Sequence, residues 1–352
     1  MNGALVYNDY ILLLKKRKIN GLTTLSSQIQ PSSIDLSLSA ECYETKTSFL
    51  CPKTKVIDKI KKLSFKKINL KHPKILKKNK TYLIKLNEVL KLNDFIRGYC
   101  NPKSSTGRLN IFCRTILDYC DEYEKIPPNY NGEMFLEITT RSFDIKVTAG
   151  DKLNQMRLIR KNNNYLNDKA LNQINNQSPI IFTKNNKSID NGLKISVDLS
   201  DDKKICAYVA RKVKSHINFS KIKYYNPKKF WKPLKPKNKS LIIEKNKFYI
   251  LKSKEKIRIP SNLAGEMVPY DTGIGDFRVH YAGFFDPGFG GQNGSYAVLE
   301  VKTNELPFII EDGQTIARIR YEKLNKKTTV LYGSSINSNY QNQKLALSKH
   351  FK

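Results

Sequence analysis

Residues 78–85, KNKTYLIK, recur with small changes as residues 245–252, KNKFYILK. They match at an offset of 167 positions. Further along the chain, FLEI at 135–138 recurs as VLEV at 298–301, at an offset of 163. Two blocks in the same order and at nearly the same offset indicate a duplicated domain.

Within each repeat, apolar and polar residues alternate over short runs that are bounded by Gly, Pro, Asn and Asp. This period of two is typical of half-buried β-strands, and helical periodicity is weak outside the first 20 residues and residues 165–175. We therefore expect an all-β-dominated chain of two tandem barrels or sandwiches with a few short helices.

A length of 352 residues agrees with two domains. A stretch rich in Lys and Asn, about 161–190, separates the repeats and is expected to be a loop. We place an N-terminal domain at 1–175 and a C-terminal domain at 176–352. Residues 191–240 are expected to add strands to the second repeat.

The composition, 39% hydrophobic and 27% charged, is that of a globular protein and excludes a disordered chain. The 63 basic and 31 acidic residues give a formal net charge of +32, with 51 Lys and only 12 Arg. Specific nucleic-acid binding relies on Arg, so we expect none, although the positive field attracts anions such as nucleotides. A non-catalytic basic protein that binds nucleic acid or senses nucleotides remains an alternative.

The six Cys are irregularly spaced and form no CxxC pair, which indicates free thiols in a reducing compartment. No apolar run approaches the roughly 18 residues of a membrane span, so we expect no membrane partner and a cytoplasmic location. Zinc-dependent deaminases need a His or Cys beside a Glu and then PCxxC. The sequence has no such pattern, and we expect no metal-ligating residues.

Residues 102–108, PKSSTGR, combine hydroxyls, backbone amides and a guanidinium, which suits a phosphate chain. The second repeat reads PYDTG at 269–273, where Asp271 would repel phosphate. The opposite asymmetry follows: FFDPGFGG at 284–291 is an aromatic turn with one carboxylate, whereas the first repeat has IPPNYNG at 126–132. Each repeat therefore holds a motif that the other lacks.

Several motifs together resemble the dCTP deaminases of the dUTPase superfamily, and more narrowly their long, tandem-domain bacterial members. They are QIQPSSIDL at 28–36, PKSSTGR, FWKPL at 230–234, FRVHYAG at 277–283, FDPGFGG with VLEV, and the tail with YG at 332–333 and NYQNQ at 339–343. The resemblance implies a distorted, jelly-roll-like β-barrel in each half. It also implies hydrolytic deamination of dCTP to dUTP and ammonia without a catalytic metal, with Mg2+ accompanying the triphosphate.

By motif position, the resemblance gives roles to individual residues. Glu300 would activate the water, with Glu137 as its counterpart in the first repeat and Arg108 beside the reacting groups. Backbone groups near Ala282 would hold the water. The other substrate-binding residues would be Lys103, Ser104, Ser105, Arg108, Asp286, Phe289, Tyr332, Tyr340 and Gln343, the last three from a tail that closes as a lid.

Alternatives stay open at this stage. Glu137 could instead be a structural strand residue paired with Arg114 or Arg157. We expect one type of working site, built from the 104–108 turn of the first repeat and from the Asp-Pro-Gly turn with Glu300 of the second. If the tail is a lid, deletion of 332–352 should cost activity but little thermal stability. A dUTPase or a bifunctional deaminase is an alternative activity, and a homo-oligomer is possible.

Overall fold

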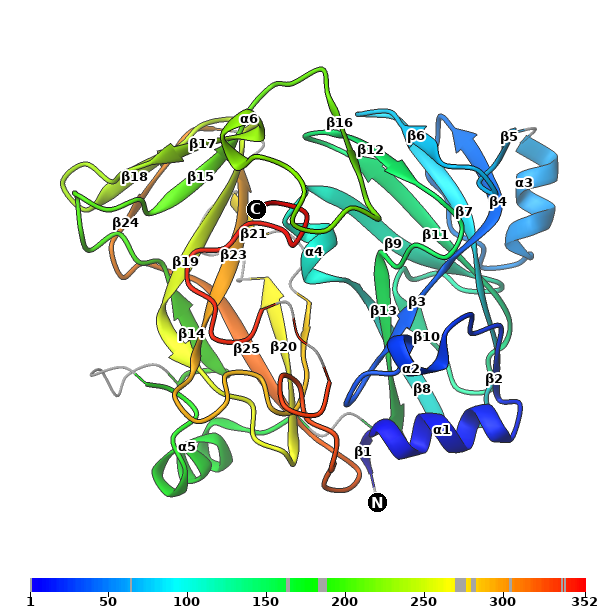
Figure 1. Cartoon of the computed structure of the whole chain (residues 1–352). Coiled ribbons are helices and arrows are strands. Elements are labelled where there is room, and N and C mark those ends of the chain that lie inside the picture. The colour runs from blue at the N-terminus through cyan, green and yellow to red at the C-terminus, as the bar shows by residue number, and fades with distance from the viewer. Residues whose placement is uncertain are drawn as a thin grey trace. The chain divides into compact units, whose positions relative to one another are not determined.

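The computed structural model describes residues 2–63, 65–162, 165–182, 189–269, 277–279, 283–303, 306–336, 338 and 340–352. These residues form two compact units, both built mainly from strands (Figure 1). Unit 1 comprises Met1–Asn163 and Lys214–Ile222, and unit 2 comprises Asn164–Val213 and Lys223–Lys352. The expected all-β class with a few short helices is confirmed.

Unit 1 contains three sheets and four short helices among the described residues. The sheets have the orders β1-β13-β8-β10 with β3 on β13, β5-β4-β7-β11-β9 with β2 on β7, and β16-β12-β6. The elements are β1 (Gly3–Ala4), α1 (Tyr7–Lys15), β2 (Ile19–Asn20), α2 (Leu25–Gln28), β3 (Ile34–Leu36), β4 (Leu38–Thr45), α3 (Val56–Leu63), β5 (Lys66–Asn69), β6 (Lys74–Leu76), β7 (Thr81–Lys91), β8 (Ile96–Pro102), α4 (Ser104–Gly107), β9 (Ile111–Leu117), β10 (Lys125–Ile126), β11 (Asn131–Thr140), β12 (Asp144–Val147), β13 (Asn154–Arg160) and β16 (His216–Asn218).

Unit 2 has the corresponding three sheets, in the orders β14-β25-β20-β22, β17-β15-β19-β23-β21 and β18-β24. Its elements are α5 (Asp168–Gln177), β14 (Leu193–Ser196), β15 (Ala207–Ala210), α6 (Pro227–Phe230), β17 (Trp231–Leu234), β18 (Ser240–Ile243), β19 (Phe248–Ile257), β20 (Leu263–Pro269), β21 (Phe277–Val279), β22 (Phe284–Phe285), β23 (Ser295–Thr303), β24 (Phe308–Glu311) and β25 (Thr315–Lys323).

The strand pairing confirms the duplication inferred from the two sequence blocks. In unit 1, β11 lies between β7 and β9, and Glu137 faces Leu83 on one side and Arg114 on the other. In unit 2, β23 lies between β19 and β21, and Glu300 faces Ile250. The β8–β13 and β20–β25 ladders correspond in the same way. The two Glu residues therefore occupy equivalent strand positions.

The core of unit 2 shows on which face of its sheet Glu300 lies. Ala297, Leu299 and Val301 belong to the large buried cluster of this unit. Since successive strand residues point to opposite faces, Glu300 lies on the other face. It is nevertheless only 5% exposed, so this second face is also covered.

Different segments cover this face in the two repeats. In unit 1, α3 and the loop before it supply Cys51, Val56 and Ile60, which pack with Phe135 on β11. In unit 2, Trp231 at the start of β17 packs on Phe248 of β19, which lies on the Glu300 face, and on Phe351 near the end of the chain. Comparison of the two repeats could not detect the segments that pack on these faces, because neither segment has a counterpart in the other repeat.

The unit boundary falls between residues 163 and 164, whereas the sequence division was placed at 175, inside α5. The helix at 168–177 belongs to unit 2 because Leu171 packs in its core. The expectation that all of 191–240 joins the second repeat is wrong for β16, which pairs in parallel with β12 of unit 1.

All six Cys are buried free thiols, as expected. Within the described ranges, no helix combines the length and apolarity that a membrane crossing requires.

Candidate active site

Glu137 forms an ion pair with Arg114, one of the two structural partners that the sequence offered. Arg114 Nε donates to Glu137 Oε1 at 2.9 Å, and the Ser48 hydroxyl donates to Glu137 Oε2. The Arg114 guanidinium lies 3.6 Å from the centroid of the Tyr123 ring, which fixes it further. Because both carboxylate oxygens are engaged and its charge is neutralised, Glu137 is poorly placed to activate water. The other candidate partner, Arg157, donates instead to the Ser32 carbonyl.

Glu300 occupies the equivalent position in unit 2 with different neighbours. It is buried in the middle of β23 and faces Ile250 on β19. The pairing of β21 with β23 runs from Phe277↔Thr303 to Val279↔Val301, where the described part of β21 ends. Ala282 lies outside the described residues. Residues 270–273, which stand in the second repeat where the first has the Ser-Ser-Thr-Gly-Arg turn, also lie outside them.

The Asp-Pro-Gly turn after β22 is a tight turn that requires its glycines. Gly288 and Gly290 have φ values of +96° and +84°, a region that favours glycine. A Cβ on Gly290 would lie 2.1 Å from the Ile257 carbonyl oxygen. The turn buries Asp286 and Phe289, whose backbones are joined by a 3.1 Å hydrogen bond from Phe289 N to Asp286 O. Sequence and structure therefore agree that this is a tight turn.

The tail lies against this turn. Tyr332 N donates to the Pro287 carbonyl at 2.8 Å, and the Tyr332 ring lies 6.0 Å from that of Phe289. Gln341 contacts the turn twice, accepting from Gly290 N at 3.1 Å and donating to Gly288 O at 3.1 Å. Gln343 donates from its side chain to the Tyr296 carbonyl at 2.8 Å, where β23 begins. Unit 2 thus brings Asp286, Phe289 and three tail residues together. Gln341 was missed in the sequence because it is one amide among many polar residues.

The end of the chain is a structural segment, which corrects the expectation that 332–352 is dispensable for folding. Lys223, Tyr224 and Tyr225 donate backbone hydrogen bonds to carbonyls of residues 349 and 350. Phe351 is 6% exposed and packs on Phe230 and Trp231, with ring centroids 5.6 and 6.0 Å away. The Tyr340 hydroxyl accepts a hydrogen bond from Lys349 N at 3.1 Å, which connects the tail to residues 349–351, the anchor at the end of the chain.

The Ser-Ser-Thr-Gly-Arg run forms a single helical turn, α4, directly after β8. Lys103 O accepts from Thr106 N at 2.8 Å and from Gly107 N at 3.0 Å. The Thr106 hydroxyl donates to the Leu153 carbonyl, which ties the turn to the start of β13. Ser104 is partly exposed, whereas Ser105 and Arg108 are each 3% exposed. The turn therefore presents Lys103 and Ser104 outward and holds Ser105 and Arg108 inside.

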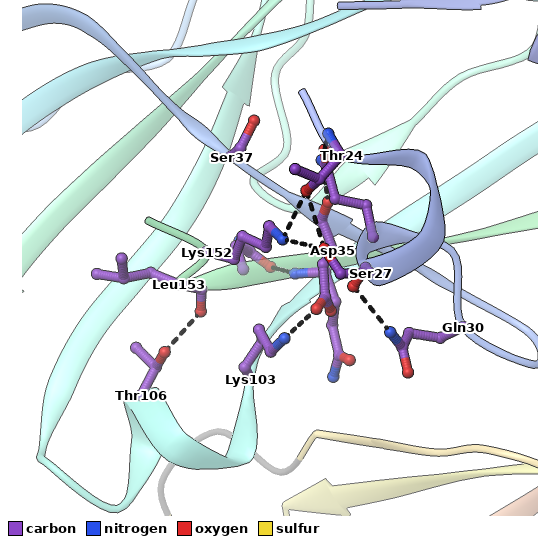
Figure 2. Close-up of polar contacts among 12 residues, drawn as sticks. Thr24, Ser27, Gln30, Asp35, Ser37, Lys103, Thr106, Lys152 and Leu153 are labelled. Atoms are coloured by element: carbon purple, nitrogen blue, oxygen red, sulfur yellow. Dashed lines mark hydrogen bonds and ion pairs between the residues drawn. The ribbon is translucent and has the colours of Figure 1, made fainter. Parts of the chain in front are cut away.

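Two charged residues beside this turn were not singled out in the sequence. Asp35, on β3, forms an ion pair with Lys103, and Lys152 lies in the same cluster (Figure 2). They come from segments 68 and 49 positions from Lys103, and no local spacing connects them. Among the described residues, no group of three or more His, Cys, Asp or Glu side chains is placed to hold a metal ion.

The two halves of the chain match family models separately. The N-terminal domain model of 2'-deoxycytidine 5'-triphosphate deaminase matches residues 1–162, and the C-terminal domain model of the same enzyme matches residues 167–351. The chain belongs to the dCTP deaminase family. The resemblance is thereby confirmed over nearly the whole length, and the two matched ranges follow the two units except for residues 214–222, which lie in the C-terminal range but in unit 1.

A solved structure of the dCTP deaminase family agrees with this. The chain is similar to the crystal structure of 2'-deoxycytidine 5'-triphosphate deaminase from Agrobacterium tumefaciens, with a TM-score of 0.87 and 36% sequence identity. The match covers 92% of this chain and 99% of that chain. No sequence among the curated proteins matches.

Proposed function

We propose that this chain hydrolyses dCTP to dUTP and ammonia, with Glu300 as the group that moves protons. The observation that supports this best is the match to the dCTP deaminase family across both repeats. The contrast between the two repeats supports the choice of Glu300, because both carboxylate oxygens of its counterpart Glu137 accept hydrogen bonds, from Arg114 and from Ser48.

The proposed reaction follows from the chemistry of the cytosine ring. Glu300 takes a proton from water as the oxygen bonds to C4, and passes it to the ring nitrogen N3. It then moves the second proton from the new hydroxyl to the amino group. The C4–N bond breaks, ammonia leaves, and the C4 carbonyl forms. A positioned acid/base group contributes about 10² to 10⁴-fold, so oriented dipoles around the ring must supply the rest.

The substrate-binding roles divide between the repeats. Ser104, Ser105 and Arg108 would bind the triphosphate, which enters as its Mg2+ complex. Asp286 would accept from the deoxyribose hydroxyl, and Phe289 would pack on the sugar and disfavour a ribose. The clamp between Gln341 and the glycine turn supports a tail that covers this part of unit 2. We place the reaction in the cytoplasm, and a homo-oligomer remains a prediction.

An assay that scores products separately tests the activity. Purified protein is incubated with dCTP, CTP or dUTP in the presence of Mg2+, and ammonia and pyrophosphate are measured independently. We expect one ammonia per dUTP from dCTP, little turnover of CTP, and no pyrophosphate. Ammonia together with dUMP and pyrophosphate would identify a bifunctional enzyme, and pyrophosphate from dUTP alone would identify a dUTPase.

A further inference from the structure

Three charged side chains from separate segments of unit 1 meet beside the Ser-Ser-Thr-Gly-Arg turn (Figure 2). Lys103, the residue before α4, pairs with Asp35 on β3, whose side chain is 5% exposed. Lys152, just before β13, donates from Nζ to the Thr24 hydroxyl at 3.0 Å and to the Ser27 hydroxyl at 2.8 Å. We refer to Asp35, Lys103 and Lys152 as the lysine cluster.

The lysine cluster carries more positive than negative charge in a half-buried place. Burial lowers the pKa of Lys152; Asp35 opposes this shift and Lys103 adds to it. A second carboxylate, that of Glu88, also acts to raise the pKa of Lys152. Glu88 is fully buried, and its carboxylate already accepts hydrogen bonds from Ser37 and Gln28. Asp35 is paired with Lys103, whereas the Lys152 ammonium donates to two neutral hydroxyls.

Taking an ammonium group partly out of water without a paired carboxylate raises the free energy of the protein, and a bound anion offsets this desolvation. The lysine cluster is also accessible. The Lys103 side chain is 22% exposed, Lys152 is partly exposed, and Thr24 and Ser27 are exposed. The two hydroxyls accept from Lys152, which leaves one of its three N–H donors for a ligand.

The second repeat shows that the fold does not need these charges. Asp35 faces Gln155 in the β3–β13 ladder, and the equivalent pair in the β14–β25 ladder is Lys194 with Arg318. Aligned on Gly150 and Gly313, Lys152 corresponds to Thr315. Aligned on Pro102 and Pro269, Lys103 corresponds to Tyr270. The lysine cluster therefore occurs only in the repeat that carries the Ser-Ser-Thr-Gly-Arg turn.

We propose that Lys152 extends the triphosphate site beyond the Ser-Ser-Thr-Gly-Arg turn and binds the outer phosphates of the nucleotide, and that Asp35 is a positioning residue that holds Lys103 beside the turn. This inference rests on the proposed function, since it adds Lys152 and Asp35 to the substrate site in which Lys103 is already expected. Lys103 follows β8 directly and shares the turn with Ser104, so a phosphate chain bound there would run toward Lys152.

The test compares Lys152→Met with Lys152→Arg and with Lys85→Met. Lys85 is a matched control, because it is also in unit 1, is 26% exposed and is paired with a carboxylate, that of Glu133. A charge-assisted hydrogen bond contributes about 1.5–3 kcal/mol, so Lys152→Met should raise the KM for dCTP about 10- to 100-fold with a small change in kcat. Lys152→Arg should restore most of the affinity, and Lys85→Met should leave KM unchanged.

Inorganic tripolyphosphate serves as a second probe that does not depend on turnover. We expect it to compete with dCTP and to bind wild type more tightly than Lys152→Met in calorimetry. Asp35→Asn should weaken tripolyphosphate binding, and Asp35→Glu should restore it. The inference is overturned if Lys152→Met and Lys85→Met change KM equally, or if tripolyphosphate inhibits without competing with dCTP. Because the calorimetry needs no deamination, failure of the proposed function would be seen separately, as absence of ammonia from wild type.

Discussion

At the scale of single residues, Glu137 and Glu300 occupy equivalent strand positions but have different neighbours, since Arg114 and Ser48 hold the Glu137 carboxylate. Both lie in the same four-residue pattern, so the sequence identifies two candidates. It also contains Arg114, yet it leaves open whether Arg114 or Arg157 is the partner of Glu137. That choice depends on strand register: Arg114 faces Glu137 directly across β9 and β11. Ser48 comes from a loop 89 positions away from Glu137, and no spacing rule connects them.

The ion pair predicts a stability effect for Glu137. Glu137→Gln removes the charge that pairs with Arg114 in a place where the Glu137 side chain is 4% exposed. We expect a loss of about 1–3 kcal/mol in the free energy of unfolding, measured by urea denaturation. Glu133→Gln is the control, because the Glu133 side chain is 40% exposed and its pair with Lys85 should contribute under about 1 kcal/mol. Equal stability of wild type and Glu137→Gln would contradict this assignment.

Glu124 predicts a dependence of stability on pH. Burial raises its pKa from the ordinary 4.5 to about 7, against hydrogen bonds from Thr115 and Asn154. The folded protein therefore binds this proton more tightly than the unfolded chain does. Its contribution to stability is fully present below pH 4.5 and is lost as pH rises through about 7.

The measurement is urea unfolding of wild type and Glu124→Gln at several pH values from 5 to 8. We expect the stability of wild type relative to the variant to fall as pH rises, because Gln does not titrate. A constant difference over this range would show that Glu124 ionises normally.

At the scale of elements, the structure corrects the view of the tail. Its polar composition, rich in Asn, Ser and Gly, is typical of a lid or a frayed end. The last residues do not follow that pattern, since His350 is fully buried and Phe351 packs among aromatic rings. A single Phe in a polar tail is a weak signal in sequence, because its pocket is made by residues 225–231, more than 100 positions earlier.

The anchor predicts a loss of stability in Phe351→Ala. Removal of a buried aromatic side chain typically costs about 3–5 kcal/mol. We expect a lower midpoint in thermal unfolding, and Leu306→Ala serves as a control because Leu306 is 71% exposed. Unchanged thermal stability in Phe351→Ala would restore the earlier expectation of a dispensable tail.

The two hydrogen bonds of Gln341 to the glycine turn predict an effect on substrate binding with little effect on stability. Gln341→Ala removes both hydrogen bonds to Gly288 and Gly290 at a partly exposed position, so the stability should change by less than about 1 kcal/mol. If the tail covers the nucleotide, the KM for dCTP should rise several-fold. Steady-state kinetics with a parallel thermal melt measures both, and an unchanged KM would exclude Gln341 from the lid.

At the scale of the whole molecule, comparison of the two sequence repeats predicts the strands that the two units share and misses the segments that occur in one unit alone. The offsets of 167 and 163 lead directly to equivalent strands, since β7 with β11 and β19 with β23 form the same ladder. Single-copy segments leave no internal match. Among them are α3, which covers the Glu137 face, and β16, which pairs with β12 of unit 1. Their placement is decided by tertiary packing.

The net charge of +32 predicts a dependence on salt. A positive field raises the encounter rate with an anionic nucleotide, and added salt screens it. We expect kcat/KM for dCTP to fall steadily between about 50 and 500 mM salt while kcat changes little. A kcat/KM that is independent of salt would show that the excess of Lys has no part in substrate capture.

We infer that Glu300 moves the protons in the deamination of dCTP, whereas Glu137 stabilises unit 1 through its ion pair with Arg114. The most direct measurement is ammonia release from dCTP by Glu300→Gln and by Glu137→Gln, each confirmed as folded under the assay conditions. We expect Glu300→Gln to release no ammonia above the uncatalysed rate and Glu137→Gln to retain much of the wild-type kcat. Comparable loss in both folded variants would contradict this inference.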